Sequence, residues 1–412
     1  MTATTLFYLF IAILVFNFLL EAFLDYLNAK HFNDPIPDLL KDVYNETEYQ
    51  KAQAYKKENE RFSTISELFS LSITLLFFFF KGFAYVDELA RKFTDNELVI
   101  SLLFFGIIMF ASDVISTPFS YYHTFVIEQK YGFNKMSKKL FWIDKIKSWF
   151  LMLIFGGIIL SIIILFYQKT GTHFWLYTWL FIAVFSVFMT LFYSSLIVPL
   201  FNKQKPLEQS ELKDKIDAFA KKVGFKLDTI FVIDGSKRST KANAYFSGFG
   251  AKKRIVLYDT LINDLEPNEV VAVLAHEIGH YKKKHVFINM VISIVLTGFT
   301  LYILSLLIDN PLLSEALSVK QMSFHIGLIA FGVLYTPISL ITGLLMNILS
   351  RKFEYQADNY AKQHYNASDL ITGLKKLSKN SLGNLTPHKW YVFFHYSHPS
   401  LYQRIKNLSS DY

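Results

Sequence analysis

The residues with the clearest chemical potential form an HExxH pattern, His276, Glu277 and His280. On a helix, residues four apart share one face, so the two imidazoles can bind one tetrahedral zinc ion. Glu277 follows the first histidine and can act as a general base on a water at the metal. The apolar residues 270–274 favour a helix here. The pattern predicts a zinc site that hydrolyses peptide bonds.

A third ligand must come from elsewhere in the chain. The sequence has no cysteine, so histidines and carboxylates must hold any metal. Glu354 and Asp358 form an ExxxD pattern that alone is typical of a charged helix face. Downstream of HExxH, Glu354 can complete a site of two histidines and one glutamate, which leaves one position open. Asp358, one turn later, can accept a hydrogen bond from a ligand histidine.

The remaining histidines receive no catalytic role. His285 lies five residues after His280, so on a continuous helix it faces another direction, as an interfacial histidine would. His123, His325 and His364 have no partner at helical spacing and are assigned no role.

The composition indicates a membrane protein, mainly α-helical. Hydrophobic residues make up 52% and charged residues 18%, against about 25% in an average soluble protein. A membrane-spanning helix needs about 20 mostly apolar residues. The stretches that meet this condition are 5–25, 65–86, 98–118, 149–167, 174–200, 286–308 and 324–349. The fold class is therefore a polytopic protein with seven spans and a small α+β protease unit, and the first run reads as a retained span.

Positive charge predicts the topology. The net charge of +8 lies mainly beside apolar runs, with no basic stripe apart from them, which argues against nucleic acid as a partner. Lys and Arg gather between spans one and two and between spans three and four. The positive-inside rule then places the N-terminus outside or in the lumen and the C-terminus in the cytoplasm. The expected divisions are 1–200, 201–285, 286–349 and 350–412.

The segment 201–285 reads as the α+β unit. Ser210 is the expected N-cap of a helix over 211–223 that ends at Gly224. Pro267 suits the first position of the helix that carries HExxH, and this helix can continue into the sixth span. The expected strands are 228–233, 243–249 and 254–258.

Several separate stretches of the chain, taken in order, together resemble one known protein family. No single motif among them would be sufficient. They are 122–128 with 131–134, 235–239, 243–246, the HExxH helix, 354–358 and 397–399. The chain resembles the type I CAAX prenyl proteases, seven-span zinc endopeptidases of membranes. The likeness extends over nearly the whole length.

The resemblance implies one zinc ion and assigns roles by position. It implies that the zinc ligands are His276, His280 and Glu354, with Glu277 as catalytic acid and base. It also implies that Asn243, His398 and Arg404 hold the substrate backbone and steady the oxyanion. A hydrogen-bonding or positive group suits that second task. An asparagine on an exposed strand can help to bind a peptide by strand addition.

The resemblance further implies a large water-filled chamber with the zinc near its cytoplasmic side. Glu21 and Asp113, polar residues within apolar runs, suit positions facing such an interior. One stretch departs from the family. Where Ser-His-Ser often precedes the asparagine in the family, this chain has Ser-Thr-Lys-Ala at residues 239–242.

Three functions remain open at this level. The first is a membrane zinc endopeptidase that removes the last three residues of prenylated CaaX proteins, in the endoplasmic reticulum membrane if eukaryotic or the inner membrane if bacterial. The second is a quality-control protease with the same chemistry and no prenyl specificity. The third is a transporter or channel with a structural metal, against which the open coordination position and the absence of a visible inverted repeat argue.

Overall fold

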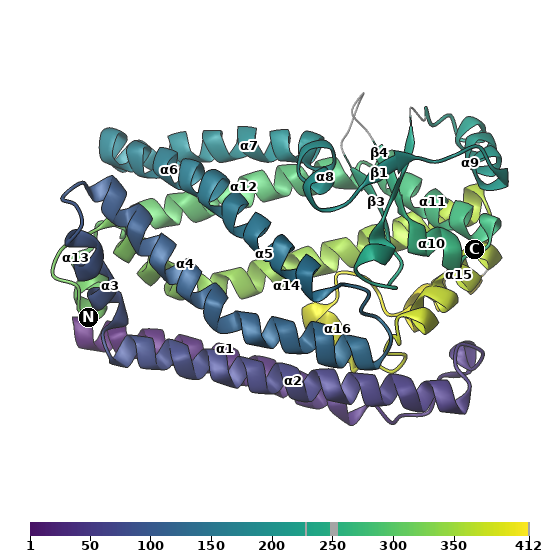
Figure 1. Ribbon diagram of the computed structural model, residues 1–412, viewed down its shortest axis with the longest axis horizontal. Helices are drawn as coiled ribbons and strands as arrows, with labels where there is room; N and C mark the ends of the chain where they lie inside the picture. The colour runs from purple at the N-terminus through teal and green to yellow at the C-terminus, as the bar shows by residue number, and fades with distance from the viewer. Residues whose placement is uncertain (227–228, 248–253, 411–412) are drawn as a thin grey trace.

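The structure is a computed structural model that describes residues 1–226, 229–247 and 254–410. Long helices run along its longest axis (Figure 1). The N-terminal part contains α1 (Ala3–Lys30), α2 (Glu46–Phe79), α3 (Gly82–Arg91), α4 (Glu97–Tyr122), α5 (Lys138–Leu151), α6 (Gly157–Thr170), α7 (Phe174–Leu196) and α8 (Val198–Phe201). A π-helical turn, His123–Glu128, extends α4.

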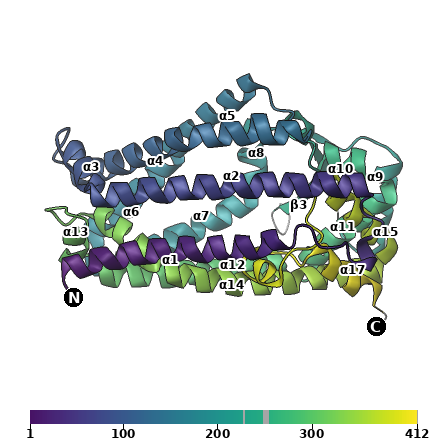
Figure 2. The ribbon, with the colours of Figure 1, turned by 90° about the horizontal axis from the view of Figure 1, so that it is seen from below.

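The C-terminal part combines short helices with two further long ones. Its helices are α9 (Glu211–Lys222), α10 (Asp259–Asp264), α11 (Pro267–Lys282), α12 (His285–Leu307), α13 (Pro311–Ala316), α14 (Phe324–His364), α15 (Ala367–Asn380), α16 (Lys389–His395) and α17 (Leu401–Ser409). Seen from below, α1 and α2 lie next to each other along the molecule, and α12 and α14 follow the same axis (Figure 2).

The long helices expose apolar surface on the scale that a lipid bilayer requires. Six helical segments of the described chain are long and apolar enough to cross a membrane, and at most 17% of each apolar window is buried. One of them, 138–201, contains both the fourth and fifth expected spans. It reverses at Gly171, where φ is 53°, so that α6 and α7 pack against each other. The predicted multi-pass, mainly helical fold is confirmed.

Two polar side chains within the spans have partners from other helices. Asp113 on α4 accepts hydrogen bonds from Lys145 Nζ at 2.6 Å and Trp149 Nε1 at 2.7 Å. Glu21 on α1 lies 3.3 Å from His395 Nε2 on α16. These contacts satisfy carboxylates that would otherwise be costly among apolar helices.

A four-stranded sheet lies at one end of the helices. Its strands are β1 (Gln204–Pro206), β2 (Ile230–Ile233), β3 (Ala244–Ser247) and β4 (Arg254–Tyr258), in the order β1-β2-β4-β3. β2 and β4 are parallel, whereas β3 pairs antiparallel with β4 and forms an edge. The structure contains all three expected strands, but 228 and 248–249 lie outside the described residues. The sequence interpretation missed β1.

The helices beside the sheet begin where their capping residues predict. Ser210 accepts a hydrogen bond from the Lys213 amide at the start of α9, and Gly224 follows that helix with φ at 58°. Glu266, the N-cap residue, and Glu269, in the first turn, form a capping box on either side of Pro267, the first residue of α11. α11 packs against α9, α14 and α15, and its buried apolar residues form the centre of the largest core cluster.

The end of α11 and the length of α14 bear on the expected divisions of the chain. α11 does not continue into the sixth span. It ends at Lys282, and Lys284 adopts a left-handed conformation with φ at 60° before α12 begins. α14, in contrast, passes without a break through the expected boundary at 349–350. The seventh span and the ExxxD segment therefore belong to one helix.

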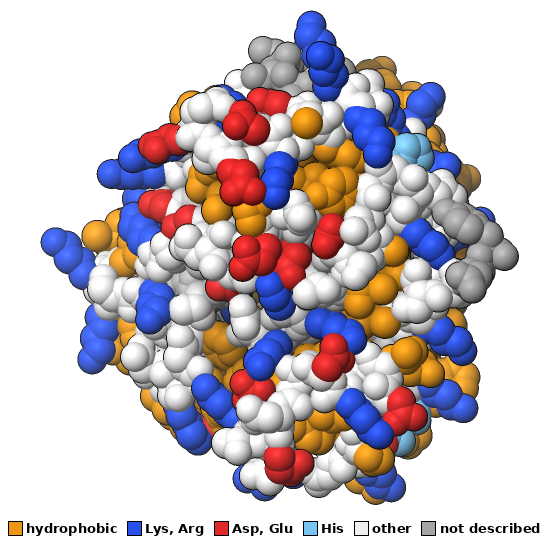
Figure 3. Space-filling view, turned by 90° about the vertical axis from the view of Figure 1, so that its right-hand side faces the viewer, with side chains coloured by type: hydrophobic (Ala, Val, Ile, Leu, Met, Phe, Trp, Pro, Cys, Tyr) orange, Lys and Arg blue, Asp and Glu red, His pale blue; other side chains and the backbone are white. Residues whose placement is uncertain are grey.

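The surface at the sheet end is strongly charged. Lys, Arg, Asp and Glu side chains are spread over this face, and many of the side chains that project from its outline are Lys or Arg (Figure 3). The lengths of the helices, in contrast, expose large hydrophobic side chains such as Phe16, Leu19 and Val184. The molecule thus has a polar end and an apolar shaft.

Candidate zinc centre

Two helices bring the expected zinc ligands together at the polar end. α11 supplies His276 and His280, and α14 supplies Glu354. His276 Nε2 lies 3.1 Å from His280 Nε2 and 3.4 Å from Glu354 Oε2, while His280 Nε2 lies 3.1 Å from Glu354 Oε1. One ligand atom from each residue lies within 4.8 Å of the others.

These three residues fit a zinc ion. Ligand atoms about 2 Å from zinc at tetrahedral angles are about 3.3 Å apart, close to the spacing seen here. Glu354 is buried, and its Oε2 atom has no hydrogen-bond partner. An unpartnered buried carboxylate oxygen is costly, and a bound cation removes that cost. Three protein ligands leave one coordination position for water or substrate.

A chain of polar contacts continues from His276 away from the ligand cluster. Asp358 Oδ1 lies 2.8 Å from His276 Nδ1. Arg404 on α17 donates to both oxygens of Asp358, through Nε at 2.9 Å and Nη2 at 2.6 Å. The carboxylate of Asp358 thus lies beside the ring nitrogen of His276 that faces away from the ligand cluster. Asp358 is completely buried, so its negative charge needs a positive partner, and Arg404 supplies it.

The same contacts change the acidity of His276. Burial disfavours the charged imidazole, but the nearby carboxylates of Asp358 and Glu354 outweigh this and raise the pKa of His276 to about 9. Burial also raises the pKa of Glu277, whose opposing influences are the positive charges of His276 and His280. A glutamate with a raised pKa is a stronger base when ionised.

His285 supports the second ligand, His280. The sequence interpretation missed this role of His285. Its Nδ1 lies 3.0 Å from His280 Nδ1, and its Nε2 lies 2.8 Å from Gln356 Oε1. Its ring stacks on Phe353 with centroids 4.0 Å apart, and the residue is buried. The expectation of an interfacial histidine is wrong. The left-handed Lys284 breaks the helix and turns His285 back toward His280.

His398, between α16 and α17, also reaches the ligand cluster. Its Nε2 lies 3.3 Å from Glu354 Oε1, and 60% of its side chain is exposed. Ser397 Oγ lies 3.0 Å from the other ring nitrogen. Arg404 Nη1 comes within 3.8 Å of Glu354 Oε2. The imidazole is thus the solvent-accessible group beside the ligands, whereas the guanidinium is largely committed to Asp358.

Asn243 lies at the start of the edge strand. Its side-chain oxygen accepts from the Ala244 amide at 2.8 Å, and its carbonyl accepts from the Tyr258 amide at 3.0 Å. It lines a cavity of about 740 Å³ with Tyr245 and Val286. No hydrogen bond or ion pair between the described residues joins Asn243 to the zinc ligands.

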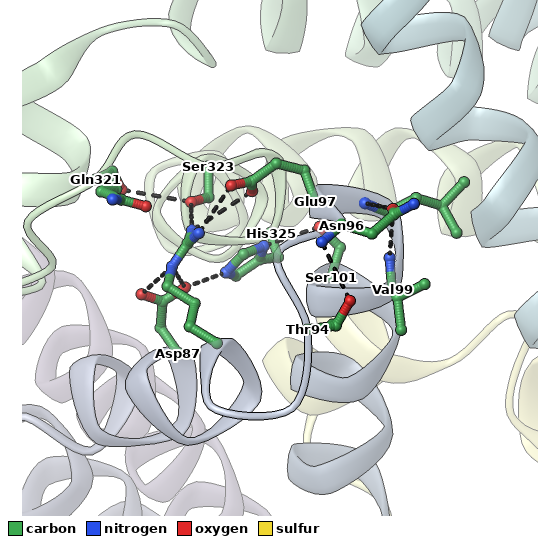
Figure 4. Close-up of polar contacts among 11 residues, drawn as sticks. Asp87, Thr94, Asn96, Glu97, Val99, Ser101, Gln321, Ser323 and His325 are labelled. Atoms are coloured by element: carbon green, nitrogen blue, oxygen red, sulfur yellow. Dashed lines mark hydrogen bonds and ion pairs between the residues drawn. The ribbon is translucent and has the colours of Figure 1, made fainter.

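The histidine with the least exposure lies at the other end of the molecule. His325 is completely buried, with Ser101 Oγ 2.9 Å from Nδ1 and Asp87 Oδ1 2.8 Å from Nε2 (Figure 4). Arg91 binds Asp87 and donates to Ser323. This cluster joins α3, α4 and α14 and belongs to the packing of that end.

Long apolar helices around a site of two histidines, one carboxylate and an adjacent glutamate define a membrane-embedded zinc metallopeptidase. Residues 25–203 match the family described as CAAX prenyl protease N-terminal, five membrane helices, and residues 206–411 match peptidase family M48. The chain belongs to the CAAX prenyl protease 1 family of the M48 zinc peptidases.

The relatives cover almost the whole chain. CAAX prenyl protease 1 homolog of Dictyostelium discoideum is 38% identical and covers 95% of both chains. CAAX prenyl protease 1 of Saccharomyces cerevisiae is 34% identical over 95% of this chain and 92% of its own. The crystal structure of S. mikatae Ste24p superposes with a TM-score of 0.94, at 33% identity, over 98% of this chain and 99% of the other. The transporter alternative finds no support.

Proposed function

We propose that this chain hydrolyses the peptide bond after a prenylated cysteine and so releases the last three residues of CaaX proteins. The observation that carries the proposal is the convergence of His276, His280 and Glu354 beside Glu277, in a chain whose relatives are named CAAX prenyl proteases. The zinc chemistry belongs to the family. The prenylated substrate is inferred from the names of the relatives.

Each polar residue has a task in this reaction. Bound zinc would acidify a water and polarise the scissile carbonyl. Glu277 takes the proton of the attacking water and returns it to the leaving amine. Because its surroundings are desolvated, its pKa lies above the ordinary glutamate value of 4.5, which suits it to both steps.

Arg404 supplies positive charge beside the ligands, and His398 supplies a hydrogen-bond donor there. The exposed imidazole of His398 can donate to the oxyanion as negative charge develops there. Arg404 acts mainly through Asp358, which holds the His276 ring in place for zinc. Its guanidinium also adds positive charge near Glu354.

The substrate backbone binds along the edge of the sheet. β3 is an edge strand, so its free side can pair with an extended peptide. Asn243, at the start of β3, faces the cavity of about 740 Å³ and positions the peptide there. The α+β unit over 201–285 and the segment 350–412 then act together as the protease unit, and the spans within 1–200 and 286–349 hold it in the membrane.

The location follows from the same proposal. The relatives named above are eukaryotic, which supports the endoplasmic reticulum membrane. Lys and Arg beside the sheet end support a cytoplasmic protease unit with the N-terminus in the lumen.

A pair of matched peptides tests the proposed substrate. Purified protein in lipid bilayers is given a farnesylated peptide ending in CaaX and the same peptide without the lipid, and release of the terminal tripeptide is measured. We expect faster release from the farnesylated peptide. Equal rates would instead favour a quality-control protease without prenyl specificity.

A further inference from the structure

A groove runs between α2 and α4. Its upper part, of about 760 Å³, is lined by residues of α2 from Ala54 to Ile65 and of the α4 side from Pro118 to Tyr131. Its lower part, of about 340 Å³, begins at Ser66 and shares Phe119 with the upper part. We call the two together the α2–α4 groove.

The upper part carries excess positive charge. Three cations, Lys57, Arg61 and Lys130, line it against one carboxylate, Glu58. Lys130 Nζ lies 2.6 Å from Glu58 Oε2, so this pair is neutral. Lys57 donates to Asn33 Oδ1 at 2.8 Å. Neither Lys57 nor Arg61 has an ion-pair partner among the residues that the structure describes, so two positive charges remain for an anion.

Aromatic rings form the wall where the charge ends. Phe62 stacks on Tyr122 with centroids 5.4 Å apart, and Phe119 contacts Phe69 at 4.9 Å. Arg61 immediately precedes the apolar part of α2. A basic residue followed by aromatic rings is typical of the boundary between headgroups and acyl chains.

The lower part is apolar in spite of its serines and threonines. The hydroxyls of Ser66, Thr74 and Ser116 donate to carbonyls of their own helices, at 2.8, 2.8 and 3.1 Å. Apart from the hydroxyls of Ser70 and Ser112, the lining groups left for a ligand are hydrocarbon, including Ile73 and Ile115.

The groove opens away from the acidic side of α2. Electrostatic interaction couples Asp25 of α1 with Glu60 and Glu67 of α2. At about 100° per residue, Arg61 and Ile65 point roughly 100–140° away from Glu60. Ile65 is 63% exposed. The groove thus opens away from Glu60 and Glu67, on a face of α2 where an apolar side chain is exposed.

We propose that the α2–α4 groove binds an anionic glycerophospholipid. The phosphate contacts Arg61 and Lys57, and one acyl chain lies along the lower part toward Ile73. Guanidinium and ammonium groups both bind phosphate oxygens, which a free phosphate also offers. The apolar lower part is continuous with the charged part and can hold an acyl chain. A free phosphate has no apolar group to place there, so the continuity favours the lipid.

Lipid retention tests the proposal on the full-length protein. The protein is released from nanodiscs that hold equal amounts of phosphatidylserine and phosphatidylcholine, and native mass spectrometry counts the lipids that remain bound. We expect wild type to retain phosphatidylserine preferentially. The double variant Lys57→Gln, Arg61→Gln should lose this preference by about tenfold or more, since it removes charge-assisted phosphate contacts.

The matched control removes two positive charges outside the groove, Lys51→Gln with Lys213→Gln, and should retain phosphatidylserine like wild type. Unchanged zinc content and melting temperature show that the variants are folded. Wild type also provides a test without substitution: excess glycerophosphoserine, which has no acyl chains, should not displace the lipid. Displacement by that headgroup, or equal retention of both lipids by wild type, overturns the proposal.

Discussion

At the scale of single residues, Asp358 connects a zinc ligand to a fixed positive charge. Its carboxylate contacts His276 Nδ1 and both donors of Arg404, and none of its surface is exposed. A buried carboxylate without these partners would be strongly destabilising. The contact with Nδ1 leaves Nε2 of His276 free to face the zinc position. Asp358 therefore determines both the orientation and the acidity of this ligand.

That acidity predicts how zinc affinity depends on pH. Because the pKa of His276 is raised to about 9, the metal-free protein holds a proton there below that pH, and zinc must displace it. We expect zinc affinity to rise from pH 6.5 to about 9 and then level off. Titration against a chelator of known affinity at each pH measures this.

The matched variant for this prediction is Asp358→Asn. It removes the anionic partner, so the plateau should begin at a lower pH, and the affinity at the plateau should fall by about 10–100-fold. An affinity that is already constant from pH 7, or an unchanged profile in the variant, would contradict the role given to Asp358.

The sequence indicated some residues of the zinc centre but not others. HExxH fixes two ligands within one helical turn, and the later glutamate and aspartate follow from the chemistry that zinc requires. His285 could not be found in this way, because its direction depends on a left-handed residue, Lys284, in a run of lysines with no glycine to signal the break.

At the scale of elements, the centre depends on close contact between α11 and α14. Gly279, inside the HExxH motif, makes that contact possible. A Cβ atom there would lie 3.0 Å from Tyr360 Cβ and 3.1 Å from Ala357 Cα. Ala357 precedes Asp358 and lies one turn after Glu354, so displacement of this backbone moves both carboxylates away from α11.

The variant Gly279→Ala should therefore lose stability and zinc together. Overpacking of this kind costs about 1–3 kcal/mol. Gly343→Ala on α14 and Gly106→Ala on α4 are matched controls, since a Cβ at either position meets nothing within 4 Å. They should keep zinc and gain up to about 1 kcal/mol from helix propensity. Thermal unfolding and metal analysis distinguish these outcomes, and normal zinc content in Gly279→Ala would refute the packing argument.

Helix starts were easier to predict than helix ends. Ser210 and Pro267 mark the starts of α9 and α11 through local chemistry that the sequence shows directly. The sequence left open whether α11 continues into the sixth span, because no glycine or proline marks the break at Lys283 and Lys284. The three-residue strand β1 contains Pro206 and has too little pattern to be recognised without its partner β2.

At the scale of the whole molecule, an apolar shaft carries a polar protease end. Composition and apolar runs predicted this arrangement, because both follow from the contrast between lipid and water. Long-range contacts, such as α14 linking the seventh span to the third zinc ligand, depend on how helices pack and have no local pattern.

The proposed orientation of this shaft has a direct test. Glycosylation acceptor sites are added at the N-terminus or after the C-terminus, and the protein is synthesised with microsomes. We expect modification only at the N-terminus, because the basic loops keep the sheet end in the cytoplasm. Modification only at the C-terminus would reverse the topology.

The most direct measurement of the whole account is zinc content and turnover in the same preparation of Glu277→Gln. We expect one zinc per chain, since His276, His280 and Glu354 are intact, and turnover lower by about 10²–10⁴-fold because the general base is lost. Glu354→Ala, prepared alongside, should lose the zinc itself. Wild-type turnover in zinc-loaded Glu277→Gln would contradict the account.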